Sequence, residues 1–205
     1  TNNFLLALTA LVWGSAFVAQ SVGMDYLGPF TFNSIRSVMG GIVLLPVIFI
    51  LKRQDRKSRK TKTPAGSRKT LIIGGICCGA ALAVASSLQQ IGIMYTTAGK
   101  AGFITALYIL IVPILGLFLG KRAGMKVWIG VGLAVAGMYF LCITDGFSIS
   151  KGDFLVFLCA IVFSVHILVI DYFAPKVDGV CLSCIQFFVC GILCAVPMLV
   201  QEQPR

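Results

Sequence analysis

The chain has 205 residues, of which 58% are hydrophobic and only 12% are charged, and its formal net charge is +10. Soluble domains carry about twice that share of charged residues, because polar side chains must cover their surface. The composition therefore excludes an ordinary soluble protein and makes lipid the solvent for much of the exterior. The apolar residues also fall into long blocks, and about 20 apolar residues in a helix match the hydrocarbon thickness of a bilayer.

Seven apolar blocks follow one another, and we expect each to be a membrane-spanning helix, since backbone amides in lipid must be satisfied within the segment. The expected helices cover residues 4–22, 30–51, 71–95, 101–119, 127–143, 154–173 and 180–200. A β-barrel would need strands that alternate apolar and polar residues, and Ile109-Leu110-Ile111-Val112 shows no such alternation. The sequence thus predicts an all-α integral membrane protein, a multi-span helical bundle.

Basic residues indicate the orientation of these helices. Of the 17 Lys and Arg residues, 13 lie in the connections after the second, fourth and sixth expected helices, and three lie on the opposite side. The positive-inside rule places those connections in the cytoplasm, and the N-terminus with them. We expect the long basic connection 52–69 to contact anionic lipid head groups. It lacks the interleaved aromatic residues that would favour a nucleic-acid partner.

The eight cysteines all lie in or at the edge of apolar blocks. Cys181 and Cys184 have the spacing of a metal or redox pair. There is no second pair and no His beside them, and a thiol on a helix behaves as a small hydrophobic group. We therefore expect the cysteines to pack the helices, and we expect neither a metal nor a cofactor.

Uncharged polar residues inside the blocks are the candidates for a solute pathway. The densest group is Ser86-Ser87-Leu88-Gln89-Gln90, where such side chains either hold helices together or line a cavity. Thr105 and Tyr108 are three residues apart and share a helix face. The pathway candidates are Trp13, Ser15, Gln89, Gln90, Tyr95, Thr105, Tyr108 and His166.

Three ionisable residues are expected within the membrane, where such groups are costly and are often functional. His166 lies near the middle of its helix and could carry a proton or be a neutral imidazole bonded to a neighbouring helix. Asp171, nearer the cytoplasm, could pair with Lys176 or sit at the interface. Arg36 could bind an anionic group, extend to the outer surface or hold helices together.

Small residues and one proline are candidates for helix packing or for hinges. Gly75-x-x-x-Gly79 and Gly116-x-x-x-Gly120 have the spacing of close helix contacts. Pro113 interrupts a backbone hydrogen bond and predicts a kink in the fourth expected helix.

A weak internal repeat relates the two ends of the chain. An offset of 150 residues sets Phe4-Leu5 on Phe154-Leu155, and an offset one residue longer sets Gly40 and Pro46 on Gly191 and Pro197. Five helices separate the two copies, so the copies would have opposite orientations in the membrane, as is common in secondary transporters. The second copy is incomplete, and we expect the chain to be cut short.

The stretch from Gln89 to Leu141 carries an ordered set of small and polar residues. It contains Gln90-x-Gly92, Tyr95-Thr96-Thr97-Ala98-Gly99-Lys100-Ala101-Gly102-Phe103, Pro113, Trp128-Ile129-Gly130-x-Gly132 and Ala136-Gly137. With Leu11-Val12-Trp13-Gly14-Ser15-Ala16-Phe17 and Ile35-Arg36, the chain resembles the EamA-type transporters of the drug/metabolite transporter superfamily over nearly its whole length. Where that family usually has a Gly-Glu pair, this chain reads Gly120-Lys121-Arg122, which leaves a gating or coupling role of the acid without support.

The resemblance implies ten helices arranged as two inverted repeats of five. This chain would hold seven of them, with 4–143 as the first repeat and 154–205 as the start of the second. It also implies a secondary transporter that moves a small metabolite, such as an amino acid or a related compound, out of the cell.

A membrane receptor or an assembly protein without transport remains an alternative. A membrane-embedded enzyme is a further one, although no H-E-x-x-H or G-x-S-x-G motif is present. The expected partners are the lipid bilayer and a small-molecule solute, with a homodimer left open and no nucleic acid. The expected location is the cell membrane, namely the inner membrane of a bacterium.

Overall fold

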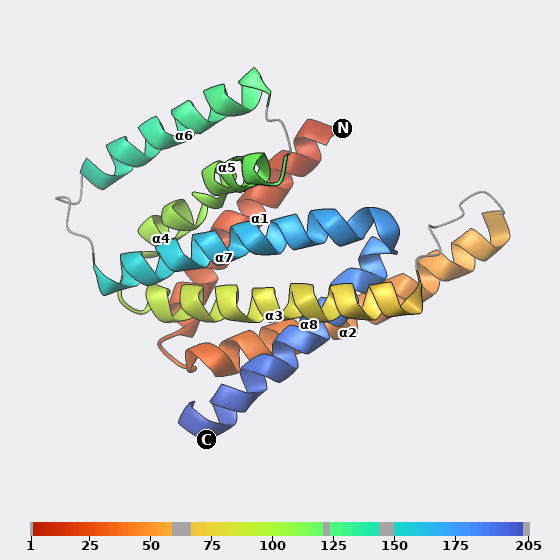
Figure 1. Ribbon diagram of the computed structural model, residues 1–205. Helices are drawn as coiled ribbons and strands as arrows, with labels where there is room; N and C mark the ends of the chain where they lie inside the picture. Colours follow the sequence, from red (N-terminus) through yellow and green to blue (C-terminus); the bar gives the residue numbers. More distant parts are fainter. Residues whose placement is uncertain (1, 59–66, 121–123, 144–149, 203–205) are drawn as a thin grey trace. The chain divides into compact units, whose positions relative to one another are not determined.

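The computed structural model describes residues 2–58, 67–120, 124–143 and 150–202, and these residues form helices joined by short turns (Figure 1). The α-helices are α1 (Asn2–Gly23), α2 (Pro29–Ser58), α3 (Arg68–Ile93), α4 (Ala98–Thr105), α5 (Tyr108–Phe118), α6 (Met125–Ile143), α7 (Lys151–Phe173) and α8 (Gly179–Pro197). A 3₁₀ turn, η1 (Ala174–Lys176), follows α7, and a π-helical turn, η2 (Met198–Glu202), follows α8. The predicted all-α fold class is confirmed.

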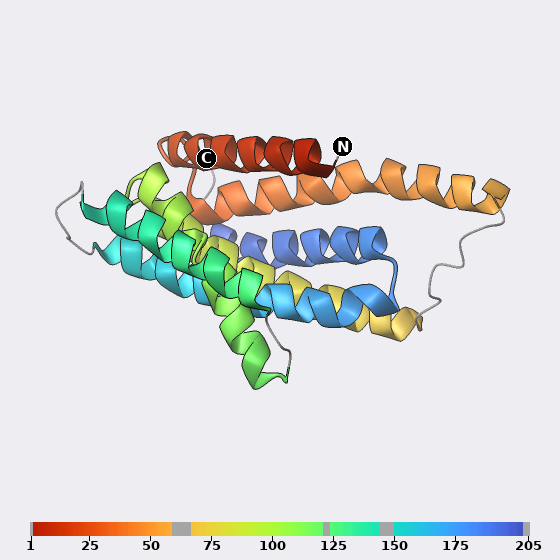
Figure 2. The ribbon, with the colours of Figure 1, turned by 90° about the horizontal axis from the view of Figure 1, so that it is seen from above.

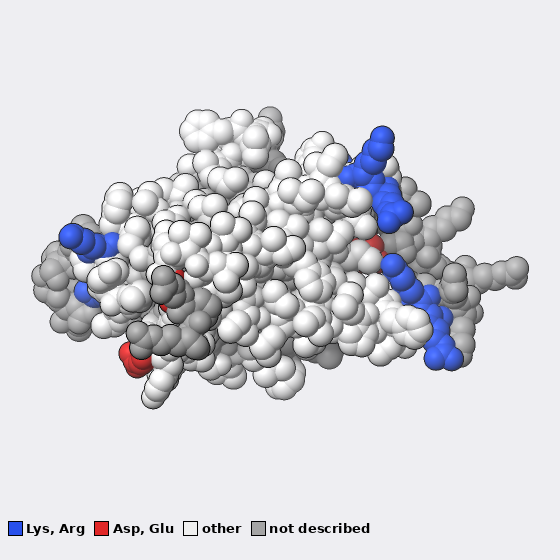
Figure 3. Space-filling view, turned by 90° about the horizontal axis from the view of Figure 1, so that it is seen from below, with Lys and Arg blue, Asp and Glu red and all other residues white. Residues whose placement is uncertain are grey.

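Five helical stretches of the described residues are long and apolar enough to cross a membrane. They are Pro29–Gln54, Arg68–Ile93, Ala98–Phe118, Lys151–Lys176 and Gly179–Glu202. Two shorter apolar helices, Ala7–Gly23 and Met125–Gly137, account for the first and fifth predicted blocks. Figure 3 shows a face on which most of the visible surface belongs to residues other than Lys, Arg, Asp and Glu.

Several basic residues that support the predicted orientation lie outside the described residues. They are Arg59, Lys60, Lys62, Lys121 and Arg122. The orientation of the chain in the membrane therefore stays a prediction from the sequence.

The fourth predicted helix is divided into α4 and α5, with Ala106 and Leu107 between them (Figure 1). Across this break the backbone hydrogen bonds join residues three apart, as in a 3₁₀ turn. They run from Leu107 N to the Ile104 carbonyl at 3.1 Å and from Ile109 N to the Ala106 carbonyl at 2.9 Å. Pro113 lies within α5, almost two turns after this break, and the kink expected at the proline stays a prediction.

The chain forms two compact units, which we describe separately. The first unit contains Thr1–Pro29 and Leu88–Ser164, and the second contains Phe30–Ser87 and Val165–Arg205. Helices α3 and α7 contribute residues to both. This division and the predicted sequence repeat are different divisions of the chain, and neither tests the other.

Helix α8 lies beside α2 and α3 in the second unit, in both Figure 1 and Figure 2. Gly75 and Gly79 of α3 face α8 so closely that a Cβ built on Gly79 would lie 2.6 Å from the Val189 Cβ. On the opposite side, a Cβ on Gly191 of α8 would lie 2.7 Å from a methyl group of Val38. Small residues of this kind let membrane helices approach at backbone distance.

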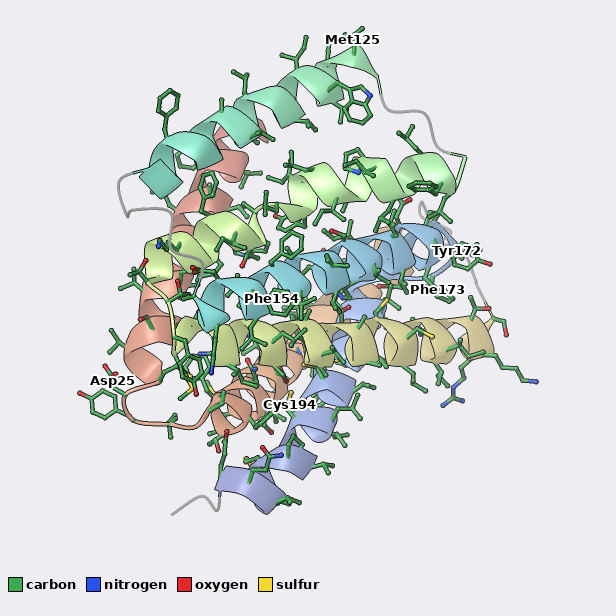
Figure 4. All side chains as sticks on the ribbon, turned by 60° about the vertical axis from the view of Figure 1, so that its left-hand side comes forward. Asp25, Met125, Phe154, Tyr172, Phe173 and Cys194 are labelled. Carbon is green, nitrogen blue, oxygen red and sulfur yellow. The ribbon has the colours of Figure 1, made fainter. Side chains whose placement is uncertain are left out.

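The end of α7 completes this packing. A Cβ on Gly74 would lie 2.9 Å from the Phe173 ring. The ring of Tyr172 meets that of Phe173 edge to face at 5.0 Å, and Figure 4 labels both side chains.

The first unit packs around a small apolar cluster of Ile93, Ala101 and Val156, which come from α3, α4 and α7. Phe17 and Met24, from α1 and the turn after it, pack against this cluster. A Cβ built on Gly92 would lie 2.6 Å from a Val156 methyl group, so α3 and α7 also meet at a glycine.

Candidate functional site

The two neighbouring glutamines near the end of α3 are buried in the first unit. Gln89 donates a hydrogen bond from Nε2 to the Thr105 hydroxyl at 3.1 Å, and that hydroxyl donates to the Ala101 carbonyl at 2.7 Å. The structure thus brings two of the pathway candidates together. Because a Thr hydroxyl bonded to the carbonyl four residues back tends to bend a helix, this contact also fits the break directly after Thr105.

Gln90 is completely buried, with 0% of its surface exposed. Its Nε2 donates to the backbone carbonyl of Gln20 in α1 at 3.3 Å. The side-chain oxygens of both Gln90 and Gln20 are buried and accept no hydrogen bond from the described residues. A buried carbonyl without a donor costs about 1–3 kcal/mol, so this place calls for a donor that the described residues do not supply.

The aromatic pathway candidates lie toward the surface of the first unit. Trp13 and Tyr108 meet edge to face with ring centroids 6.2 Å apart, a favourable geometry for two aromatic rings. Trp13 is 55% exposed and Tyr95 is 60% exposed. Ser15 is also exposed, and its hydroxyl donates to the Val12 carbonyl at 2.9 Å.

A carboxylate that the sequence reasoning did not select joins α7 to the turn after α3. Asp153 accepts from the Thr96 hydroxyl at 2.5 Å and from the Ser150 backbone N–H at 2.9 Å, and Asp153 N bonds to the Ser150 hydroxyl at 3.0 Å. This reciprocal pair is a capping box, in which side chains at both ends of the first turn satisfy free backbone N–H groups. Thr97 caps α4 in turn, by accepting from Lys100 N.

His166 lies in the second unit and is buried. Its Nε2 lies 3.2 Å from Oε1 of Gln186, which is also buried and belongs to α8. An amide oxygen can only accept, so this contact requires the proton on Nε2. The geometry is that of an imidazole bonded to a neighbouring helix, and a role in proton transfer stays a prediction.

Arg36 extends from the first half of α2 in the second unit. Its Nη2 donates to Oδ1 of Asn33 at 3.0 Å, and its guanidinium carbon lies 5.6 Å from the centre of the Phe32 ring. Asn33 is completely buried, and its Nδ2 donates no hydrogen bond within the described residues.

The remaining charged candidate lies at the other end of the second unit. Asp171 is exposed near the end of α7. The ammonium group of Lys176 lies 3.1 Å from the centre of the Tyr172 ring, as in a cation–π contact.

The described cysteines are in the free thiol form, and several of them pack against α2 and α3 in the second unit. Cys190 lies 3.3 Å from the Ser37 hydroxyl, and Cys194, labelled in Figure 4, lies 3.8 Å from that of Ser87. Cys184 lies 3.6 Å from the Gly41 carbonyl, and Cys142 falls outside the residues whose side chains are described. No group of three or more His, Cys, Asp or Glu suited to a metal occurs in the described part of the chain.

The second glycine pair differs from the first. Gly116 is buried within α5, whereas Gly120 follows the end of that helix with φ of 76° and has open space around its Cα. A glycine in this left-handed conformation ends a helix without the strain that a Cβ would bring. Gly120 therefore acts where the helix stops, while Gly75 and Gly79 lie at a helix contact.

The polar residues with specific contacts that were missing from the predicted set include Gln20, Asn33, Asp153 and Gln186. A sequence signal existed for one of them, since Ser150-x-x-Asp153 before an apolar block has the pattern of a capping box. The other three are polar residues within apolar helices, and their partners lie on other helices or one turn away.

Comparison with known proteins agrees with this architecture. The model of the EamA-like transporter family matches residues 2–143. An uncharacterized transporter of Archaeoglobus fulgidus is 34% identical over 191 residues, which are 93% of this chain and 55% of that protein. The chain thus spans about half the length of this relative. No solved structure matches.

The family match covers more than half of the chain, and the resemblance first noted in the residues around Gln90 lies inside it. Together with the apolar helices, it identifies a multi-pass membrane protein. The chain belongs to the EamA-like transporter family.

Proposed function

We propose that this chain is part of a secondary transporter that moves a small metabolite, such as an amino acid, out of the cell. Membership of the EamA-like transporter family supports transport as the general activity and argues against an enzyme. The observation that carries the proposal further is the buried pair of Gln90 and Gln20, with two side-chain oxygens that lack a donor.

These oxygens belong to helices that lie in apolar surroundings. Gln90 is on α3, which is long and apolar enough to cross a membrane, and Gln20 is on the apolar helix α1. In such a place an unsatisfied carbonyl is more costly than at a soluble surface. A solute that carries N–H or O–H groups would satisfy the oxygens, and neutral amides would release it more easily than a charged partner would.

The proposal includes the inverted repeat and a cytoplasmic N-terminus in the cell membrane. The repeat is supported by the matching Gly40 and Gly191, and the orientation by the 13 basic residues on one side of the predicted helices. The proposal also includes the plasma membrane of a bacterium as the location.

A reconstituted transport assay tests the proposal. The full-length protein in liposomes is compared with empty liposomes for movement of a panel of labelled amino acids and amides. We expect movement of at least one solute, and we expect Gln90→Leu to slow it about tenfold or more, since the lost hydrogen bond corresponds to 1–3 kcal/mol. Gln54→Leu, at an exposed glutamine near the end of α2, is the matched control and should leave the rate unchanged.

Two results would count against the proposal. Movement at the background rate for every solute of the panel would favour a receptor or an assembly protein without transport. Equal rates for Gln90→Leu and Gln54→Leu would remove the buried amide from the pathway while leaving transport in place. Right-side-out and inverted vesicles, compared with each other, then give the direction.

A further inference from the structure

The N-terminal half of α2 carries hydrogen-bond donors that lack acceptors. Asn33 has 0% of its surface exposed, and its Nδ2 donates to no group in the described residues. The adjacent Ser34 differs, because its hydroxyl donates to the Gly191 carbonyl at 3.0 Å. Ser37 is likewise bonded, to the sulfur of Cys190 at 3.3 Å. Among these neighbours, Asn33 is therefore the one whose donors are unused.

Arg36 adds a positive charge one turn further along the helix. Within the described residues, its hydrogen bond is from Nη2 to Oδ1 of Asn33. This bond fixes the guanidinium beside the unused Asn33 amide group, because residues three apart share a face of the helix. The Phe32 ring covers another side of the guanidinium at 5.6 Å.

No described carboxylate neutralises this charge. Among the described residues, the thiols of Cys190 and Cys194 are the ionisable groups that interact with the Arg36 charge. Glu202 also belongs to the second unit, but its carboxylate accepts from the backbone N–H groups of Phe30 and Thr31, at 2.8 and 2.7 Å, and from the Thr31 hydroxyl. A partner that carries negative charge would stabilise a guanidinium within a membrane-length helix, and Arg36 is exposed, so such a partner can reach it.

We propose that the Asn33 amide and the Arg36 guanidinium form a binding site for an oxyanion group, either the carboxylate of a solute or the phosphate of a lipid. The guanidinium supplies a planar fork that matches two oxygens of such a group. The Asn33 Nδ2 supplies a further donor, and Phe32 sets one wall. As a statement about solutes this rests on the proposed transport function; as a statement about binding it does not.

A binding experiment on the full-length protein tests the site without relying on transport. The purified protein is delipidated in a maltoside detergent, which carries no phosphate. Its thermal unfolding is then followed while sodium acetate, inorganic phosphate or phosphatidylglycerol is added, with sodium chloride at equal ionic strength as the reference. Stabilisation of the wild type by any of the three beyond the chloride reference supports the site, provided that the variants below remove it.

Four variants locate the effect. Arg36→Gln removes the charge, Asn33→Asp replaces the donor group with an acceptor, and Lys151→Gln removes an exposed positive charge at the start of α7 as a control. We expect the first two to weaken binding of the stabilising anion about tenfold or more, as fits the loss of a charge-assisted hydrogen bond. Lys151→Gln should bind as the wild type does, and Arg36→Lys should fall between Arg36→Gln and the wild type, because an ammonium lacks the fork.

The three additions distinguish a soluble anion from a lipid head group. Stabilisation by acetate or phosphate identifies a site for soluble oxyanions, and stabilisation by phosphatidylglycerol alone identifies a lipid site. The inference is overturned if none of the three additions exceeds the chloride reference for the wild type. It is also overturned if Arg36→Gln responds as strongly as Lys151→Gln. If an anion stabilises the protein in the unfolding assay but no solute moves in the liposome assay, the proposed function is contradicted and the binding site is still supported.

Discussion

In each of the two units a carboxylate caps the beginning of a helix, and the caps made by Asp153 and Glu202 differ in range. Asp178 also caps α8 in the second unit, from the residue before that helix. In the first unit, Asp153 caps the start of α7 from within the same turn and also holds Thr96. In the second unit, Glu202 reaches the start of α2 from the other end of the chain. A cap made within one turn forms with its helix, whereas the Glu202 cap requires the fold of the whole unit.

The described buried groups without a hydrogen-bond partner are acceptors in the first unit and a donor in the second. Counted over the described residues, the first unit has two buried oxygens without donors, on Gln20 and Gln90, and the second has an unused donor group on Asn33. Since native proteins satisfy most buried polar groups, each unit calls for a different complement. The apolar helices of the two units thus differ in the polar groups that they bury. Single substitutions at these groups test the difference.

The largest effect is expected from Glu202→Ala. The substitution removes a charged acceptor of three hydrogen bonds and leaves the N–H groups of Phe30 and Thr31 without a partner. Hydrogen bonds to a charged group contribute about 1.5–3 kcal/mol, and we expect a free energy of unfolding lower by about that amount. Thermal unfolding in detergent measures it. Glu202→Gln should recover part of the loss, and an unchanged midpoint for Glu202→Ala would contradict the long-range cap.

Gly79→Ala is expected to be the next in size. The added methyl group would lie 2.6 Å from the Val189 Cβ and 2.8 Å from the Gln186 carbonyl oxygen. Overpacking of this kind costs about 1–3 kcal/mol. Gly130→Ala in α6 is the control, because a Cβ there meets nothing within 4 Å among the described residues. If both variants unfold at the same temperature, the close approach of α3 and α8 is wrong.

Asp153→Ala should cost less, because its cap is local. Asp153 is the third residue of α7, in a capping box whose N-cap residue is Ser150. Loss of a capping side chain lowers stability by about 1 kcal/mol in most proteins. The comparison between the two units requires this loss to be smaller than that of Glu202→Ala in the same unfolding assay. Asp25→Asn, at an exposed acid in the turn after α1, serves as the reference for a simple change of charge. A larger loss for Asp153→Ala would reverse the ranking of the two caps.

The smallest effect on stability is expected from Gln90→Leu. The variant gives up one hydrogen bond to the Gln20 carbonyl at 3.3 Å but removes a buried oxygen that lacks a donor. Because these two contributions oppose each other, we expect the unfolding free energy to change by less than about 1 kcal/mol. Gln89→Leu should be more costly, since the Gln89 oxygen is not among the unsatisfied atoms and its bond to Thr105 is lost. A strongly destabilised Gln90→Leu would show that the amide is structural.

The helices could be predicted from the sequence because hydropathy is a local property. Runs such as Ile109-Leu110-Ile111-Val112 have no other favourable structure in lipid. The family could also be recognised, because Gln90, Gly92 and Thr97 form an ordered pattern. In the structure Gln90 bonds to α1, Gly92 packs closely against α7, and Thr97 caps α4. The sequence pattern therefore corresponds to a place where several helices meet.

The partners of the polar residues could not be predicted. His166 and Arg36 were recognised as candidates because ionisable residues are rare in an apolar block. The sequence near His166 did not indicate its partner Gln186. Asn33, the partner of Arg36, was not selected as a candidate. Which helices become neighbours depends on contacts between residues far apart in the chain. The break after Thr105 was not predicted, and the hydroxyl bond from Thr105 to the Ala101 carbonyl fits its position.

That break also sets an angle between two contacts. A 3₁₀ turn advances three residues per turn and an α-helix 3.6, so three residues wound in the tighter form end about 60° away from where the wider form would place them. Thr105, which holds Gln89, and Tyr108, which meets Trp13, lie on opposite sides of the tightened turn. Rewinding Ala106 and Leu107 into continuous α-helix would swing one contact against the other by that angle, without breaking the helix on either side.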